Sequence, residues 1–443
     1  MLSRRALLNQ FGTICSAALV APRPVLSGTS DGSNSGLVLA PADLALSPAD
    51  ELFLEEVEKA HFLYFWEQSS PKTGLVKDHW DPSDGKELVA SLAATGFGLT
   101  ALCIGHSRGF AAPADIRARV LATLLFLWKT MPNHRGFYYH WANLNTGERI
   151  WDAEVSSIDT AILLCGVLAC REYFAWGPIA RLANAIFGRV DWGWVAEDTS
   201  LVSHGWRPEG GFLPYRWDYY SELVMMNLLG LGSTSHPLPA DTWNAWKRTT
   251  FEFDGLRYIG SFAPLFVHQY PQAWFDLRGK RDHYADYFEN SAVATEAHRR
   301  FCLELAPQFP DYSEDLWGVT ASNSPRGYEV WGGPPATGPI DGTIVPSAAG
   351  GSLVFLPQPT LRVLKTIRNR YGARSWCRYG FVNAFNPLRN WYDRGVIGID
   401  TGITLLMAEN LRTGFVWKTF MKSAEARLGL ERAGFEARPS KGL

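Results

Sequence analysis

The chain has 443 residues, of which 47% are hydrophobic and 19% are charged. Its 42 basic and 44 acidic residues are well mixed and leave a formal net charge of −2. This balance suits a globular protein with a large core and indicates neither a nucleic-acid-binding nor an anionic-membrane-binding surface. Most of the 25 Phe fill the core, but 18 Trp exceed what a core requires. Because Trp faces bind sugar rings and similar flat ligands, we expect several to line a binding cleft.

Residues 1–26 have the pattern of an export signal. Arg4 and Arg5 precede a short apolar region, residues 11–20, which is too short to span a bilayer and resembles the start of a twin-arginine signal. An ordinary secretory signal and a disordered cytosolic tail are the alternatives. Residues 27–49 are expected to form a flexible linker. We therefore expect a periplasmic or secreted protein without stable membrane insertion, folded as a single domain over residues 50–443.

Five cysteines follow the predicted signal: Cys103, Cys165, Cys170, Cys302 and Cys377. An odd number argues against a disulfide framework, and no pair has the spacing of a zinc or redox motif. We expect neither a metal nor a cofactor. The sequence carries no indication of the oligomeric state.

Two kinds of helical segment alternate along the rest of the chain. Amphipathic segments with one charged face occupy residues 49–68, 113–131, 178–190, 238–250, 359–372 and 416–430. Segments rich in Gly, Ala, Leu and Ser occupy residues 91–109, 156–174, 219–232, 287–302, 346–356 and 399–411. Inner helices of small residues wrapped by amphipathic outer helices predict an all-α fold, an (α/α)6 barrel. No outer helix is recognisable between the fourth and fifth inner ones.

A long segment rich in Gly, Pro and aromatic residues, 307–339, takes the place of that outer helix. Loops of this length in a compact domain are often functional. We expect it to close over a ligand, with Trp317 and Trp331 stacking on it and Gly332-Gly333 acting as a hinge. The alternative is a rigid loop with both tryptophans in the core.

Carboxylates gather at the starts of the expected inner helices, which all lie at one end of such a barrel. They are Asp152, Glu154, Asp159, Asp218, Glu222, Asp286, Glu289, Asp341 and Asp400. Five tryptophans are interleaved with them: Trp80, Trp151, Trp217, Trp274 and Trp317. Any single carboxylate is explained equally well as a helix cap. A whole rim of acids and aromatics instead indicates a carbohydrate-cleaving site, because glycoside hydrolysis needs one carboxylic acid and one carboxylate.

Other chemistries lack their motifs. No GxSxG, HExxH, Walker or GxGxxG pattern occurs in a usable context. A polysaccharide lyase is an alternative that would use Tyr287, His268 and Arg278, although an acidic rim repels a uronate. A non-catalytic glycan-binding protein would keep the tryptophans and tolerate loss of the acids.

Ten collinear blocks between residues 50 and 435, among them "YFWEQSSPKTGLVKD", "EVSSIDTAILLCG", "HQYPQAWFDLRG", "YFENSAVAT" and "IGIDTGITLLMAENLRTG", resemble the bacterial glycoamylase-like domain associated with glycoside hydrolase family 144. The resemblance implies an (α/α)6 barrel that acts on β-1,2-glucan or its oligosaccharides by inversion and without metal. Its partner would be an oligo- or polysaccharide.

The resemblance also implies roles for particular residues. Asp152 and Asp159-Thr160 fill the outer positions of the family's acidic motif, but Ser156 stands where a middle Asp is expected. Either Glu154 takes that role or the substrate differs. Glu222 matches the Glu of the next inner helix, while Thr401 and Ile403 replace Gln and Pro.

We expect Glu222 or Asp159 to be the acid, with Asp152 or Glu154 holding the water. The residues expected to bind substrate are Trp151, Trp217, Asp218, His268, Gln269, Trp274, Arg278, Tyr287, Asn290, Trp317 and Asp400.

Overall fold

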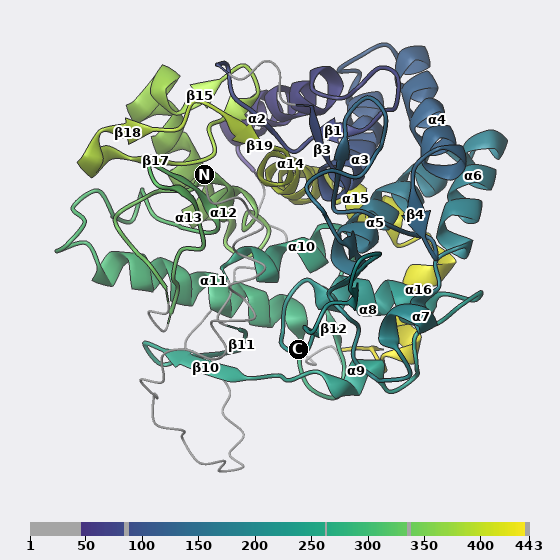
Figure 1. The fold of residues 1–443 in the computed structure, drawn as a ribbon. Helices are drawn as coiled ribbons and strands as arrows, with labels where there is room; N and C mark the ends of the chain where they lie inside the picture. Colours follow the sequence, from purple (N-terminus) through teal and green to yellow (C-terminus); the bar gives the residue numbers. More distant parts are fainter. Residues whose placement is uncertain (1–45, 84–87, 262–263, 335–337, 439–443) are drawn as a thin grey trace.

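The computed structural model describes residues 46–83, 88–261, 264–334 and 338–438 (Figure 1). The predicted export signal and residues 27–45 of the predicted linker lie outside the described residues. The first described helix begins at Pro48, two residues before the predicted domain boundary. The Ser47 hydroxyl accepts a hydrogen bond from the Asp50 amide, and the Asp50 carboxylate accepts one from the Ser47 amide. This capping box explains why the helix begins there.

Helices dominate the described part of the chain. They are α2 (Pro48–Glu67), α3 (Leu92–Arg108), α4 (Pro113–Lys129), α5 (Ser157–Phe174), α6 (Gly177–Gly188), α7 (Trp192–Ala196), α8 (Leu223–Gly232), α9 (Thr242–Ala245), α10 (Phe266–Trp274), α11 (Tyr287–Glu304), α12 (Pro346–Gly350), α13 (Pro357–Thr366), α14 (Gly398–Thr413), α15 (Phe415–Phe420) and α16 (Ala424–Arg432). A π-helical turn, Ile367–Tyr371, extends α13.

Most of the predicted inner segments form buried helices, and most of the amphipathic ones pack against their outer side (Figure 1). Helix α3 packs against α5 and α14, α5 packs against α8, and α10 contacts α8, α11 and α14. On the outside, α2 covers α3 and α14, α4 and α6 cover α3 and α5, and α16 covers α8. The helical character of the fold is therefore confirmed, although short strands accompany the helices.

Glycines allow the inner helices to approach closely. A Cβ added to Gly166 of α5 would lie 2.1 Å from the carbonyl oxygen of Gly96 in α3, and one added to Gly96 would lie 2.4 Å from the carbonyl oxygen of Ile162. Both neighbours are backbone atoms, so neither moves aside without displacing a helix. The small residues of the predicted inner segments thus set the spacing between helices.

Five elements differ from the sequence-based expectation. The expected inner helix at 346–356 is helical only over the five residues of α12. Helix α10 is a buried helix that the periodicity does not reveal, because its nine residues carry an internal proline, Pro271. The expected outer helix at 238–250 is reduced to the four residues of α9. The segment 416–430 divides into α15 and α16. Helix α8 begins at Leu223, after Asp218 and Glu222.

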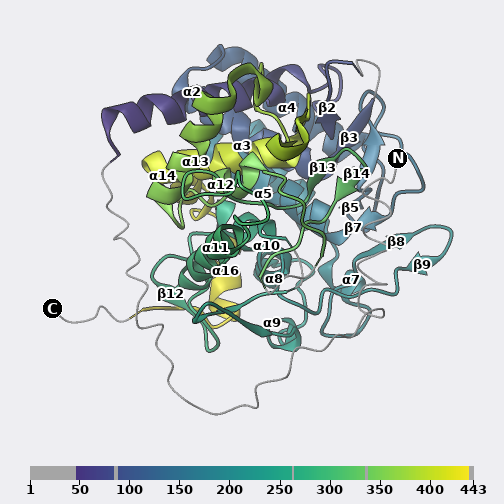
Figure 2. The same cartoon turned by 90° about the vertical axis from the view of Figure 1, so that its left-hand side faces the viewer.

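Short strands complete the fold. They are β1 (Val76–Lys77), β2 (His79–Trp80), β3 (Val89–Ser91), β4 (Asn133–His134), β5 (Phe137–Tyr138), β6 (Trp141–Asn143), β7 (Val155–Ser156), β8 (Gly205–Arg207), β9 (Gly211–Phe212), β10 (Thr250–Phe253), β11 (Leu256–Ile259), β12 (Lys280–Arg281), β13 (Ser322–Ser324), β14 (Gly327–Glu329), β15 (Trp376–Cys377), β16 (Gly380–Phe381), β17 (Phe385–Asn386), β18 (Trp391–Tyr392), β19 (Val396–Ile397) and β20 (Glu436–Ala437). The larger sheets have the orders β1-β3-β6 and β7-β8-β9. Figure 2 shows β2, β3, β5, β7, β8, β9, β13 and β14 along one side of the molecule.

Three of these strands lead into the N-termini of inner helices. Strands β3, β7 and β19 run directly into α3, α5 and α14. The Gly398 amide at the start of α14 donates to the Asp78 carbonyl, the Leu92 amide at the start of α3 donates to the His140 carbonyl, and the His140 amide donates to the Glu154 carbonyl. The three helix starts therefore lie at the same end of the inner set. No helix in the described residues is long and apolar enough to cross a membrane.

Candidate active site at the start of helix α5

Ser156 caps α5 and orients the first carboxylate of the site. Its backbone is extended, and its hydroxyl accepts a hydrogen bond from the Asp159 amide at 3.2 Å. The same hydroxyl donates to Asp159 Oδ2 at 2.6 Å. Asp159 is buried in the first turn of α5, where the helix dipole favours a negative charge. The serine found in place of the expected Asp therefore fixes the Asp159 carboxylate directly.

His140 lies between two buried carboxylates. It follows β5, and its Nδ1 lies 3.0 Å from Glu154 Oε1 while its Nε2 lies 3.5 Å from Asp159 Oδ1. The imidazole stacks on the Trp141 ring, with centroids 3.6 Å apart and an interplanar angle of 11°. Two segments, one carrying His140 and the other running from Glu154 to Asp159, thus meet at one imidazole, and its stacking partner restricts the orientation of the ring.

Glu154 is held in its ionised form. Burial alone raises the pKa of this carboxyl, but the hydrogen bond and positive charge of His140 outweigh it, with a further contribution from Arg207, and lower the pKa to about 2. Arg207 Nη2 lies 3.8 Å from Glu154 Oε2 and comes from β8, which pairs with β7. We call Glu154, Asp159, His140, Ser156 and Arg207 the α5 cluster.

An exposed turn carries Trp151 and Asp152 beside the α5 cluster. Both residues have left-handed backbones, with φ of 54° and 51°, which are costly for residues with side chains. Trp151 is 47% exposed and meets the edge of Trp141 with ring centroids 5.7 Å apart. The turn thus leaves the Trp151 side chain partly exposed to solvent, and its role in binding sugar stays a prediction.

The segment before α8 borders the same site. Trp217 Nε1 donates to the Ser157 hydroxyl at 3.0 Å, and its ring stacks on His204 at 4.0 Å. Asp218 forms an ion pair with Lys247 at 3.1 Å. Glu222 is half-buried at the N-cap position of α8, which packs against α5. Trp217 therefore contacts the start of α5, while Asp218 is paired with a surface cation.

Amide side chains hold the carboxylates near the start of α14. Asn383 Nδ2 donates to Asp400 Oδ2 at 2.6 Å, and Asn383 Oδ1 accepts from the Asn323 amide. Asn323 Nδ2 in turn donates to Asp393 Oδ2 at 2.8 Å. Burial raises the pKa of Asp393 above its usual value, although these hydrogen bonds oppose the shift. We call Asp400, Asn383, Asn323 and Asp393 the α14 cluster.

Helix α10 places three predicted substrate-binding residues in the core. Gln269 is fully buried, and its amide donates to the Ser352 hydroxyl at 2.7 Å. Trp274 is fully buried, and its indole donates to the Thr100 hydroxyl at 3.0 Å. Burial, together with the charge of His298, lowers the pKa of His268 to about 3, which keeps it neutral. Gln269 and Trp274 therefore bind protein groups, and all three side chains are buried instead of lying exposed in an open cleft.

Tyr287, Asn290 and Arg278 also make structural contacts. Tyr287 is buried, and its hydroxyl donates to Asp282 at 3.1 Å. The Asn290 side chain exchanges two hydrogen bonds with the backbone of Ile259 and so fastens β11 to α11. The Arg278 guanidinium lies 4.1 Å from the centroid of Trp417 in α15. Helix α15 follows the C-terminal end of α14, so Arg278 lies away from the helix starts that carry the site.

The tryptophans of the long segment 307–339 lie in the core. Trp317 is fully buried, and Trp331 is 2% exposed with its indole donating to the Ser322 hydroxyl at 2.8 Å. The structure therefore favours core packing over the predicted stacking on a ligand. The sequence does not distinguish a buried Trp from a cleft-lining Trp, because both kinds occur among similar neighbouring residues along the chain.

Several acids of the predicted rim cap helices or turns. The Asp286 carboxylate accepts from the Glu289 amide at the start of α11, and Arg438 pairs with Glu289 at 2.7 Å. Asp341 accepts from the amide and hydroxyl of Thr343. These contacts agree with the capping alternative.

His140 and Arg207 are functional candidates that the sequence reasoning missed. His140 occurs in the block "GFYYHW", 14 residues before Glu154, and Arg207 lies 53 residues after it, so no spacing motif joins them. Strand pairing brings them together. Among the described residues, no group of three His, Cys, Asp or Glu is arranged to hold a metal ion. Independence from metal stays a prediction.

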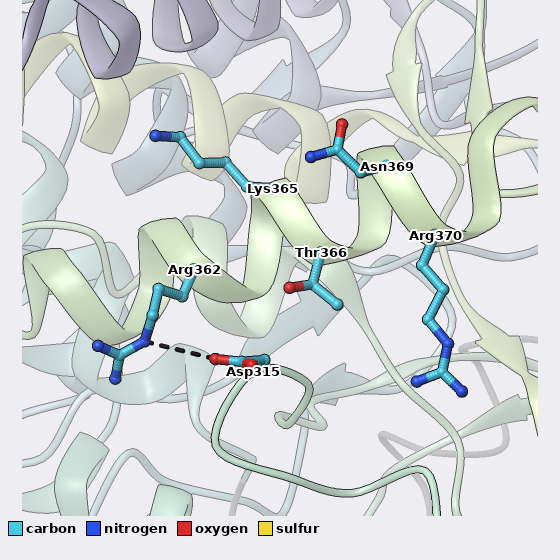
Figure 3. A pocket seen from close by; sticks show the side chains of 6 residues that line it. All are labelled: Asp315, Arg362, Lys365, Thr366, Asn369 and Arg370. Carbon is cyan, nitrogen blue, oxygen red and sulfur yellow. Dashed lines mark ion pairs between the residues drawn. The ribbon is translucent and has the colours of Figure 1, made fainter.

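One surface hollow shares no residue with the α5 cluster. It has a volume of about 460 Å³ and lies on α13 and the following π-helical turn (Figure 3). Its lining residues are Asp315, Arg362, Lys365, Thr366, Asn369 and Arg370. Arg362 pairs with Asp315 at 3.6 Å, and Arg370 pairs with Asp311 at 3.5 Å. Its arginines are therefore already neutralised by carboxylates of the protein itself.

A family model and a curated protein are both similar to this chain. A family model, Glycoamylase, described as "Putative glucoamylase", matches residues 214–424. An exo-β-1,2-glucooligosaccharide sophorohydrolase from Parabacteroides distasonis is 25% identical over 422 residues, which make up 86% of this chain and 58% of that protein. The chain thus spans little more than half the length of this relative.

Solved structures are similar over nearly their whole length. An endo-β-1,2-glucanase from Chitinophaga pinensis, in complex with sophorotriose and glucose, has a TM-score of 0.82 and 27% identity, covering 88% of this chain and 99% of that one. A Bacteroides uniformis protein with the same description as the family model has a TM-score of 0.83 and 29% identity, covering 89% and 98%. These comparisons confirm the resemblance to the glycoamylase-like family that the ten sequence blocks indicate.

Proposed function

We propose that the protein is a glycoside hydrolase that cleaves β-1,2-glucan or its oligosaccharides by an inverting two-carboxylate mechanism. The observation that carries the proposal is the α5 cluster, in which Glu154 and Asp159 are buried beside the exposed face of Trp151. Two carboxyl groups next to an indole platform supply the proton donor, the base and the sugar-binding surface that this reaction requires. The similarity to the exo-β-1,2-glucooligosaccharide sophorohydrolase and the endo-β-1,2-glucanase supports the choice of linkage.

The fold that supports this site is proposed to be an (α/α)6 barrel. The inner helices α3, α5, α8, α11, α12 and α14 would form its lining, with α10 packed among them. The contacts of α2, α4, α6, α13 and α16 with the inner set support an outer layer. The similarity to the β-1,2-glucanase structures supports the same arrangement.

The electrostatics favour a division of roles between the carboxylates. Glu154, with a pKa of about 2, is ionised at neutral pH and suits the polarisation of the attacking water rather than proton donation. Asp152 is the second candidate for this role, since it is exposed on the turn beside Trp151. Asp159 and Glu222 remain the candidates for the general acid, and both stand at helix N-termini that face the same end of the fold.

Incubation of the purified protein with a panel of β-linked glucans, followed by sizing of the products, tests the proposal. We expect shorter glucans or disaccharides from β-1,2-glucan and no cleavage of β-1,3- or β-1,4-glucan. An unsaturated product that absorbs in the ultraviolet would indicate a lyase. Binding of the glucan without any cleavage would indicate a glycan-binding protein.

We also propose that the protein is exported to the periplasm by the twin-arginine route. The pair Arg4-Arg5 before a short apolar stretch supports this location. Replacing both arginines by lysine should retain the protein in the cytoplasm, as measured by cell fractionation. Unchanged export of the double variant would contradict the proposal.

A further inference from the structure

His140 is placed so that both ring nitrogens face carboxylate oxygens. Nδ1 lies 3.0 Å from Glu154 Oε1, and Nε2 lies 3.5 Å from Asp159 Oδ1. The two acids belong to different elements: Glu154 precedes β7, whereas Asp159 stands in the first turn of α5. The imidazole is therefore the direct physical link between the two acids to which sugar cleavage is assigned above.

The charge of His140 depends on how many of its two ring nitrogens carry a proton. A neutral imidazole has one N–H and one lone pair, so one of the two carboxylates would face a lone pair. An imidazolium has two N–H donors, one for the hydrogen bond to Glu154 and one facing Asp159 at the longer, ion-pair distance. Two further titratable groups lie near Glu154. Arg207 faces it at 3.8 Å. The negative charge of Glu154 raises the pKa of His204, but burial outweighs this effect, lowers that pKa to about 4 and keeps His204 neutral. We therefore expect His140 to carry both protons, with one N–H directed at each carboxyl group.

His140 is screened from solvent and held in one orientation. Its residue is 3% exposed, and its ring lies flat on Trp141 at a centroid distance of 3.6 Å. Trp141 in turn meets the exposed Trp151 edge-on. A substrate on the Trp151 face is therefore separated from His140 by an indole ring. The residue acts through its neighbours and does not itself touch the sugar.

We propose that His140 is a positively charged positioning residue that fixes Glu154 and Asp159 relative to each other. This inference rests on the proposed function, because it assigns both acids to sugar cleavage. Removing the imidazolium would free two carboxylates to repel each other and to rotate. A displacement of about 1 Å in a catalytic group is enough to cost on the order of 10²-fold in rate.

The first test compares His140→Gln with a matched control, His134→Gln. His134 also stacks on an indole, that of Trp206, at 4.1 Å and 11°, and in the described residues no carboxylate lies within ion-pair distance of it. We expect His140→Gln to lower kcat about 10²-fold with KM changed by less than about threefold, and to move the acidic limb of the kcat profile to higher pH. The control should leave both unchanged. An equal loss in both variants, or an unshifted acidic limb, would overturn the proposal.

The second test does not depend on activity and so separates failure of this inference from failure of the proposed function. In wild-type protein labelled with ¹⁵N-histidine, the ¹⁵N shifts of His140, assigned by difference from His140→Gln, should report protons on both ring nitrogens at pH 7. In Asp159→Asn the Nε2 resonance should move more than the Nδ1 resonance. A single protonated nitrogen, or an Nε2 resonance unaffected by Asp159→Asn, would overturn the inference even if β-1,2-glucan is cleaved.

Discussion

The starts of α5 and α14 hold similar carboxylates with opposite partners. In the α5 cluster, cations hold the acids: His140 contacts both Glu154 and Asp159, and Arg207 lies 3.8 Å from Glu154. In the α14 cluster, the amides of Asn383 and Asn323 hold Asp400 and Asp393. The pKa of Glu154 falls to about 2, whereas burial raises that of Asp393.

This difference shows that the position of an acid at a helix start does not determine its protonation. A cation stabilises only the ionised form, so it outweighs burial, whereas neutral amides offset burial only in part. The surroundings of Glu154 therefore keep a negative charge in a buried place. We assign the cleavage reaction to the α5 cluster and a structural role to the α14 cluster.

The largest difference between the clusters should appear in turnover. Asp159→Asn should lower kcat on β-1,2-glucan by about 10²–10⁴-fold, the usual contribution of a general acid or base. The amide is nearly isosteric and still accepts the hydrogen bond from Ser156, so the melting temperature should change little. Asp400→Asn, the matched change at α14, should lower kcat by less than about tenfold. Equal losses in the two variants would remove the distinction between the clusters.

Stability against pH should separate Glu154 from Asp393. The folded-state pKa of Glu154 is depressed, so its contribution is present above the ordinary value of 4.5 and is lost as pH falls toward about 2. Wild type should therefore lose roughly 3 kcal/mol of this contribution over that window, and Glu154→Gln should not.

The raised pKa of Asp393 has the opposite effect on stability. Ionisation of this carboxyl destabilises the folded state as the pH rises above the ordinary pKa of an aspartate. Asp393→Asn should accordingly be more stable relative to wild type at pH 7 than at pH 3. Denaturant titrations from pH 2 to pH 7 measure both effects. Parallel pH curves for the wild type and Glu154→Gln would contradict the account of the α5 cluster.

Packing should also differ between the two helices. A Cβ at Gly166 of α5 would lie 2.1 Å from a backbone carbonyl oxygen, whereas one at Gly402 of α14 would lie 2.5 Å from Cγ of the Phe97 side chain. Gly166→Ala should therefore cost about 1–3 kcal/mol in the free energy of unfolding, and Gly402→Ala should cost less, since a ring shifts more readily than a helix. Urea titrations check the order, and the reverse order would contradict it.

The smallest effect concerns two tryptophans, one beside each cluster. Trp151→Ala should raise KM about tenfold, equivalent to about 1.4 kcal/mol of binding, with the melting temperature unchanged. Trp331→Ala, near the α14 cluster, should lower the melting temperature while KM stays the same. An unchanged KM in Trp151→Ala would mean that its exposed face does not bind sugar.

Sequence reasoning predicted the helices better than the side-chain surroundings. Runs of small residues identified α3, α5 and α14, because close helix contacts leave few alternatives to Gly and Ala. Asp152, Glu154 and Asp159 were recognisable as candidates because three acids beside an apolar run are costly without a partner. That partner, His140, was not recognisable, because strand pairing and not sequence spacing brings it to the site.

The sequence also did not predict which aromatic side chains are buried and which are exposed. Trp274 and Trp317 were predicted at the rim and are fully buried, while Trp151 is half exposed. The difference arises from helix α10 and from the left-handed turn at Trp151-Asp152. Neither feature has a clear sequence signature, since α10 contains Pro271 and the turn lacks glycine.

The stereochemistry of the first product formed from β-1,2-glucan tests the central claim most directly. Proton NMR during the first minutes of digestion distinguishes the α- and β-anomers of the new reducing end before they equilibrate. If the α5 cluster supplies an acid and a water-activating base, the β-linkage should yield the α-anomer first. Initial release of the β-anomer, or no release at all, would contradict the account.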